Sequence, residues 1–172
     1  MNNYTRRDFV QTVGLAAASL AVLPQVFAQD KPKTKIAFVG VAHIHTPGFI
    51  SLVNSRDDLA VKAVWDHDQA RAEKRAKELK SRAVSDVNEI WNDPEIKAVV
   101  ICSETNRHLE LVLAAAKAGK HMFVEKPLGI TAKDSFKMAD AIEQAGLLFT
   151  TGYFMRTDPK HLFLKEQVAK GN

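Results

Sequence analysis

The chain has 172 residues, of which 46% are hydrophobic and 26% charged, and this is enough for one globular domain with a substantial core. Its net charge of +4 comes from lysines and arginines scattered among nearly as many acids, so we expect no nucleic-acid partner. Cys102 is the single cysteine, which excludes an intrachain disulfide.

The amino-terminal stretch has the three parts of an export signal. The polar start carries Arg6 and Arg7, the apolar run Val13–Leu23 follows, and small residues come last. The arginine pair indicates the twin-arginine type of signal, which directs folded proteins across the bacterial inner membrane. The apolar run is shorter than the roughly 20 residues that a membrane-spanning helix needs, so we expect no stable membrane anchor. The prediction is a signal peptide over residues 1–28, cleavage near Ala28, a linker over residues 29–33, and a periplasmic or secreted protein.

From residue 33 on, short apolar runs alternate with longer amphipathic stretches, which is typical of βαβ units. The predicted strands span residues 35–40, 61–66, 82–84, 98–103, 121–127 and 147–153. The predicted helices span residues 47–55, 68–80, 88–95, 107–119 and 132–146. The predicted fold class is therefore α/β, with an open, doubly wound, Rossmann-like parallel sheet over residues 34–172.

Several helix ends carry recognisable signals. Thr46 before Pro47 predicts an N-cap followed by proline at the first helical position, where a missing N–H costs nothing. Gly119 and Gly146 predict the ends of the two later helices.

In sheets of this kind, ligands bind beyond the carboxyl ends of the strands, which we call the carboxyl rim. The predicted strands end there in polar or special residues, namely Gly40, Asp66, Ser103–Asn106, Glu125–Pro127 and Tyr153–Arg156. We therefore expect the functional site on this rim.

The first of these turns reads "VGVAHIHTPG", where a dinucleotide-binding protein carries the pattern G-x-G-x-x-G. The three glycine positions hold Gly40, Ala42 and His45. Ala42 adds only one methyl group, whereas His45 is a larger departure, and Gly48 is a candidate for the close-packing role of the third glycine. The N–H groups at the start of the following helix are expected to attract phosphate.

Asp66 follows Gly40 by 26 positions, close to the spacing of about 20 at which an acid binds the adenosine ribose hydroxyls. Its charge would repel a 2′-phosphate, which favours NAD, while His67 and Arg71 keep NADP as an alternative. A plain helix cap is the other interpretation of Asp66, although Asp68 is equally suited to that role.

The two histidines of the same loop also suggest a metal ion, because histidine is a common ligand. His43 and His45 alone make an incomplete site, and no acid or cysteine in the neighbouring sequence completes it. We therefore predict no metal and expect both side chains to line the cofactor or substrate cleft, or simply to cap the loop.

Further along the chain, "TNRHLELVLAAAKAGKH", "VEKPL" and "GYFMR" follow one another in order. With this set the chain resembles the Gfo/Idh/MocA (glucose-fructose oxidoreductase and inositol dehydrogenase) family over residues 34–172. The resemblance implies a nucleotide-binding domain followed by a second α/β domain that supplies much of the substrate site. Because the chain stops at Asn172, we expect a fragment that lacks the second domain and lacks turnover by itself.

The resemblance also assigns roles to positions in this chain. Lys126, in the family's E-K-P, would lie beside the nicotinamide and bind the reacting hydroxyl. Arg156 is expected to face the cleft, with pairing to Asp158 as the plainer alternative, and Glu104 departs from the small residue expected at its position. The candidate catalytic residues are Lys126, Tyr153 and Arg156. The candidate cofactor-binding residues are Gly40, Ala42, His43, Ile44, His45, Asp66, Ser103, Thr105, Asn106, His108, Glu125 and Lys126.

The expected function is that of an exported NAD(P)-dependent oxidoreductase that transfers hydride between nicotinamide and a sugar or polyol hydroxyl. NAD is the expected cofactor, and the full-length protein is expected to be a homo-oligomer. An NAD-dependent glycoside hydrolase of the same family and a non-catalytic binding module are the alternatives.

Overall fold

A computed structural model of the chain describes residues 32–171, so the predicted signal peptide lies outside the described residues. Within the described part, none of the helices combines the length and the apolar character that crossing a bilayer requires.

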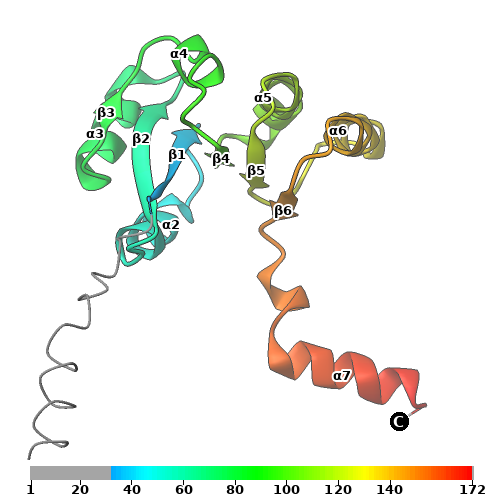
Figure 1. Cartoon of the computed structure of the whole chain (residues 1–172). Coiled ribbons are helices and arrows are strands. Elements are labelled where there is room, and N and C mark those ends of the chain that lie inside the picture. The colour runs from blue at the N-terminus through cyan, green and yellow to red at the C-terminus, as the bar shows by residue number, and fades with distance from the viewer. Residues whose placement is uncertain (1–31, 172) are drawn as a thin grey trace, which may run out of the picture. The chain divides into compact units, whose positions relative to one another are not determined.

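Six parallel strands form a single sheet, which confirms the predicted Rossmann-like fold, and they lie in the order β3-β2-β1-β4-β5-β6 (Figure 1). The strands are β1 (Thr34–Val39), β2 (Leu59–Trp65), β3 (Arg82–Ala83), β4 (Ala98–Ile101), β5 (His121–Val124) and β6 (Phe149–Thr151). The strand order reverses between β1 and β4, and this is the place where such sheets bind ligands. All the predicted strands are present, although β4, β5 and β6 end earlier than predicted because their last residues form the rim turns.

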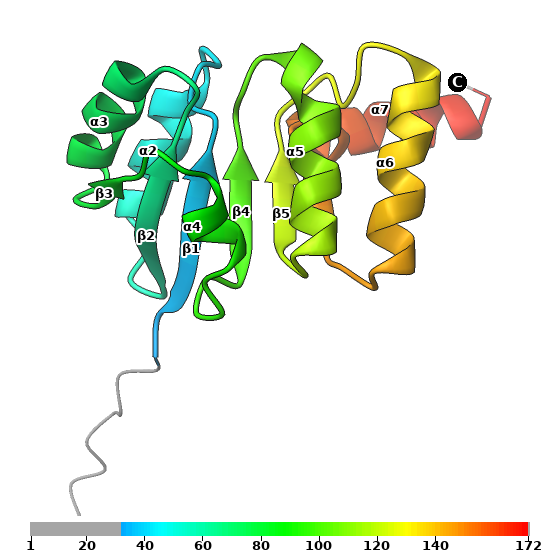
Figure 2. The same cartoon turned by 90° about the horizontal axis from the view of Figure 1, so that it is seen from above.

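The helices are α2 (Thr46–Asn54), α3 (Gln69–Glu78), α4 (Asn88–Trp91), α5 (Thr105–Lys117), α6 (Ala132–Gln144) and α7 (Pro159–Ala169), with a 3₁₀ turn η1 (Phe154–Arg156). Helices α2 and α3 cover one face of the sheet, and α4, α5 and α6 cover the other (Figure 2). Gly119 and Gly146 follow the ends of α5 and α6, as predicted. The sequence analysis did not predict α7, which stands apart from the sheet (Figure 1).

The core lies on both faces of the sheet. Along β1, Ala37 and Val39 pack toward α4, α5 and α6, while Phe38 packs toward α2 and α3. All three side chains are fully buried, which explains why this strand is a continuous apolar run rather than an alternating one.

Two predictions about the start of α2 are wrong. The helix begins at Thr46 itself, so His45 occupies the capping position and Pro47 the second helical position. Thr46 cannot cap the helix because its side chain points into the interior and is fully buried. Gly48 does not take the close-packing role either, since a β-carbon there would meet no atom within 4 Å.

Candidate functional site

The carboxyl ends of β1, β2, β4 and β5 are joined by direct contacts. The N–H of Val41, just after β1, donates to Oδ2 of Asp66 after β2 at 2.7 Å. The N–H of His43 donates to the carbonyl of Cys102 after β4 at 2.9 Å, and the His45 ring contacts the Glu125 carboxylate after β5. The arrowheads of β1, β2, β4 and β5 in Figure 2 point to this edge. The prediction that the polar strand ends share one rim is therefore confirmed for these residues.

Gly40 makes the sharp turn that starts the β1–α2 loop. Its φ is +77°, a conformation that favours glycine, and a β-carbon there would overlap the side chain of Ser103 and lie 2.7 Å from its Cα. The turns after β1 and β4 therefore approach each other too closely for any larger residue at position 40.

The loop after Gly40 presents unused hydrogen-bond donors. The N–H groups of Val41 and His43 donate to Asp66 and Cys102, and those of His45 and Thr46 donate within the loop to His43. Those of Ala42 and Ile44 bond to no acceptor among residues 32–171. Free amides just before a helix are the groups that bind phosphate in dinucleotide sites.

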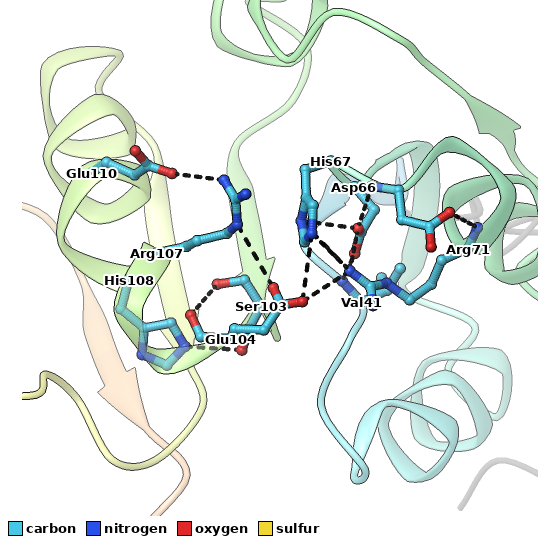
Figure 3. Close-up of polar contacts among 10 residues, drawn as sticks. Val41, Asp66, His67, Arg71, Ser103, Glu104, Arg107, His108 and Glu110 are labelled. Atoms are coloured by element: carbon cyan, nitrogen blue, oxygen red, sulfur yellow. Dashed lines mark hydrogen bonds and ion pairs between the residues drawn. The ribbon is translucent and has the colours of Figure 1, made fainter.

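The Asp66 carboxylate lies directly beside this loop (Figure 3). Besides the bond from Val41, its Oδ1 accepts from the N–H of Asp68 at 2.8 Å and from Nη2 of Arg71 at 2.7 Å. Burial alone would raise the pKa of Asp66, but these hydrogen bonds outweigh it and hold the pKa below its usual value. Asp68 caps α3 by accepting from the N–H of Arg71, so the capping interpretation belongs to Asp68.

Arg71 bridges two acids across the rim. Its Nη2 also donates to Oε1 of Glu104 at 3.0 Å, and the His67 ring lies beside the same pair (Figure 3). The side chain of Asp66 is fully covered, whereas that of Arg71 is 27% exposed. A ligand that reaches the Asp66 carboxylate must therefore displace Arg71 or bind next to it.

The turn after β4 leads into α5, which starts two residues earlier than predicted. Thr105 and Asn106 therefore lie in its first turn, with Glu104 at the capping position and Ser103 buried beneath. His108 is fully buried, and its ring nitrogens lie 3.1–3.3 Å from backbone carbonyls. These carbonyls belong to Pro127, Leu128 and Ser103. In this structure His108 links the turns after β4 and β5 and does not face the open rim.

A cluster that the sequence analysis did not foresee lies between the first loop and the end of β5. His43, His45 and Glu125 each place a potential ligand atom within 4.8 Å of the other two. Burial lowers the pKa of His43, and the nearby Glu125 carboxylate partly offsets this effect. The E-K-P motif makes Glu125 a candidate site residue. Its contact with His45 could not be read from the sequence, because the two residues are 80 positions apart.

The candidate catalytic residues lie at the β5 and β6 ends of the rim. Lys126 is partly exposed, and its ammonium group has no partner among residues 32–171. The Arg156 guanidinium lies 5.4 Å from the centre of the Tyr153 ring, while Asp158 caps α7 instead of pairing with Arg156. Tyr153 and Arg156 line a pocket of about 560 Å³ on the α2 side of β5 and β6, and Lys126 does not line it.

The model of the oxidoreductase family with an NAD-binding Rossmann fold (GFO_IDH_MocA) matches residues 34–153. The chain is 36% identical over 136 residues to a myo-inositol 2-dehydrogenase of Thermotoga maritima, which covers 77% of this chain and 41% of that protein. It is 30% identical to the scyllo-inositol 2-dehydrogenase (NAD(+)) of Bacillus subtilis, with 81% of this chain and 41% of the relative covered.

Among solved structures, a probable dehydrogenase from Thermotoga maritima superimposes with a TM-score of 0.69 at 34% identity. That match covers 80% of this chain and 41% of the other chain. The chain thus spans about two fifths of the length of the relatives it matches.

Proposed function

Because the chain belongs to the Gfo/Idh/MocA oxidoreductase family, whose shared domain is an NAD-binding Rossmann fold, we propose that it binds NAD or NADP along its carboxyl rim. We further propose that the whole protein transfers hydride between nicotinamide and a hydroxyl of a sugar or polyol. The two relatives described above are inositol dehydrogenases, which supports a cyclic polyol as the substrate class.

The observation that carries the cofactor proposal is the pairing of the first loop with Asp66. The amides of Ala42 and Ile44 offer donors for a diphosphate, and the adjoining Asp66 carboxylate offers an acceptor for ribose hydroxyls when Arg71 Nη2 is displaced from it. Gly40 keeps the loop close to the turn after β4. Ala42 and His45 replace two glycines of the pattern but leave the free amides and the Asp66 carboxylate in place. The residues present therefore fit a dinucleotide.

Bound nicotinamide supplies the group that accepts or releases a hydride. Lys126 is suited to hold the reacting hydroxyl and its proton, because its ammonium group is partly exposed and has no partner among the described residues. Tyr153 and Arg156 line the neighbouring pocket and are suited to orient a hydroxylated substrate there.

The cofactor proposal is tested by titrating the purified chain with NAD and with NADP in a calorimeter. We expect saturable binding with a dissociation constant below about 1 mM for at least one of them. Asp66→Asn should weaken NAD binding at least about tenfold, because hydrogen bonds to a charged acceptor contribute roughly 1.5–3 kcal/mol. Asp58→Asn is the matched control, since this exposed acid lies at the opposite end of β2.

No binding of either cofactor at millimolar concentration would reject the proposal. Equal losses of affinity in Asp66→Asn and Asp58→Asn would reject the assigned role of Asp66.

We also propose that the protein is exported by the twin-arginine route and that the full-length protein forms a homo-oligomer. The arginine pair and the apolar run of residues 1–28 support export. Exposed apolar side chains on η1 and α7, among them Phe154, Phe163 and Val168, are consistent with a surface that becomes covered in the assembled protein.

A further inference from the structure

His43, His45 and Glu125 form a cluster of nitrogen and oxygen atoms between the β1–α2 loop and the end of β5. Nδ1 of both histidines faces the same atom, Oε1 of Glu125, and the His43 contact measures 3.1 Å. The two imidazole rings meet edge to face with their centres 4.8 Å apart. The topology of the sheet therefore gathers three potential ligands from two distant stretches of sequence.

The Glu125 carboxylate is held in one orientation. Its side chain is fully buried, and Oε2 accepts from the N–H of Lys126 at 2.8 Å. Gly152 packs directly behind it, since a β-carbon at that position would overlap Oε2 and lie 3.1 Å from Cδ. Oε1 is consequently left pointing toward the two histidines, as a ligand supported by outer hydrogen bonds would be.

The buried Glu125 carboxylate has no lysine or arginine partner among residues 32–171. A charged group in the interior is costly unless a positive charge compensates it. The two imidazoles are the only side chains in the described part of the chain with an ion pair or hydrogen bond to Oε1, so compensation comes through them or from an ion bound between them.

Neither protonation state of His43 suits both of the groups that face its Nδ1. Nδ1 of His43 lies 3.1 Å from the acceptor Oε1 of Glu125 and 3.3 Å from the backbone N–H of His45, which is a donor. A protonated Nδ1 would oppose that N–H, and an unprotonated one would aim its lone pair at the carboxylate. A cation placed among the three groups neutralises the carboxylate and takes the Nδ1 lone pairs of both imidazoles, in exchange for the long 3.3 Å contact from the His45 N–H.

We propose that His43, His45 and Glu125 bind a divalent cation of the zinc class. Two histidines and one glutamate are a known ligand set of zinc sites that keep one coordination position open. The opening lies on the loop side, where the His45 side chain is 44% exposed and that of His43 is 19% exposed. Water or another oxygen ligand fills this fourth position. The site stands independently of the proposed cofactor and does not require it.

The test uses the full chain, stripped with a chelator and dialysed, and then titrated with Zn²⁺ alone in a calorimeter. We expect one zinc ion per chain, confirmed by elemental analysis of the dialysed complex. Replacement by Co²⁺ should give the visible absorption of a four-coordinate ion with nitrogen and oxygen ligands.

His45→Ala should weaken zinc binding more than about 100-fold, because losing even an outer partner of a ligand costs roughly 10–100-fold. Glu125→Gln should do the same, and thermal melting establishes whether this buried variant is folded. The matched control is His161→Ala, which removes a histidine of α7 with a similar side-chain exposure of 42%. It should leave both affinity and stoichiometry unchanged.

Absence of zinc uptake by the unsubstituted chain would overturn the proposal. Zinc uptake that persists in His45→Ala would also overturn it, and so would an equal loss of uptake in His45→Ala and His161→Ala. Either result would place the ion elsewhere on the surface. Because no cofactor is added, neither outcome bears on the proposed binding of NAD or NADP.

Discussion

Asp66 shows how one carboxylate combines local and distant partners. Two of its hydrogen bonds come from backbone N–H groups, at Val41 and Asp68, and the third comes from the long side chain of Arg71. The backbone bonds fix the carboxylate beside the loop, whereas the Arg71 side chain is able to rotate away. The group that controls access to Asp66 is therefore Arg71.

Replacing Arg71 by alanine should change the preference between the two cofactors. A 2′-phosphate would lose its nearby cation and face the uncompensated charge of Asp66, so we expect NADP to bind about tenfold more weakly, or about 1.4 kcal/mol. NAD affinity should change less than about threefold. Calorimetric titration of both cofactors measures the ratio.

Arg75→Ala is the control for this prediction, because Arg75 lies one turn further along α3 and pairs with Glu78 instead. An equal loss of NAD and NADP affinity in Arg71→Ala would show that Arg71 only supports the local structure.

At the scale of elements, the β1–α2 connection requires glycine at position 40 but not at position 48. Gly40 adopts a positive φ and touches Ser103, whereas Gly48 lies in α2 with open space where a side chain would be. The sequence pattern made Gly48, and not Gly40, the candidate for close packing, because it does not reveal which turn faces a neighbouring strand.

Gly40→Ala should lower the free energy of unfolding by about 2–5 kcal/mol, because it adds backbone strain of about 1–2 kcal/mol to overpacking of about 1–3 kcal/mol. Gly48→Ala should be neutral or raise it by up to about 1 kcal/mol, since alanine is the better helix former. Urea unfolding of the two variants gives both values. A loss for Gly48→Ala as large as that for Gly40→Ala would contradict the packing described here.

Helix α7 lies beyond the last predicted strand, and its start nevertheless carries a helix signal. Asp158 accepts from the N–H of Lys160 as its N-cap, and Pro159 occupies the first turn. An aspartate followed by proline is a readable start signal, so the sequence does contain the information for the beginning of this helix.

At the scale of the whole molecule, the proposed route of export governs where the protein is found. Changing Arg6 and Arg7 together to lysine should remove most of the protein from the periplasm, because the twin-arginine pathway reads the arginine pair. Cell fractionation and immunoblotting measure the distribution. The control changes Arg56 and Arg82, two exposed arginines of the folded domain, to lysine. Undiminished periplasmic protein after the first change would refute the route.

The sequence by itself determined the order of strands and helices as far as β6, the sheet type and the residues at the strand ends. It could do so because burial repeats with the period of each element, and because parallel strands joined by right-handed crossovers bring their carboxyl ends to one edge. The positions of Gly40 and Asp66 on that edge followed directly.

Only the tertiary structure decided which rim residues touch. Arg71 meets Glu104 across 33 positions and His45 meets Glu125 across 80, while His108 turns inward to the backbone. Such pairings depend on strand register and on the path of each turn, which a single sequence does not encode in any local pattern. The sequence showed two histidines without a third ligand, and the fold supplied the glutamate by placing β5 on the far side of β4 from β1.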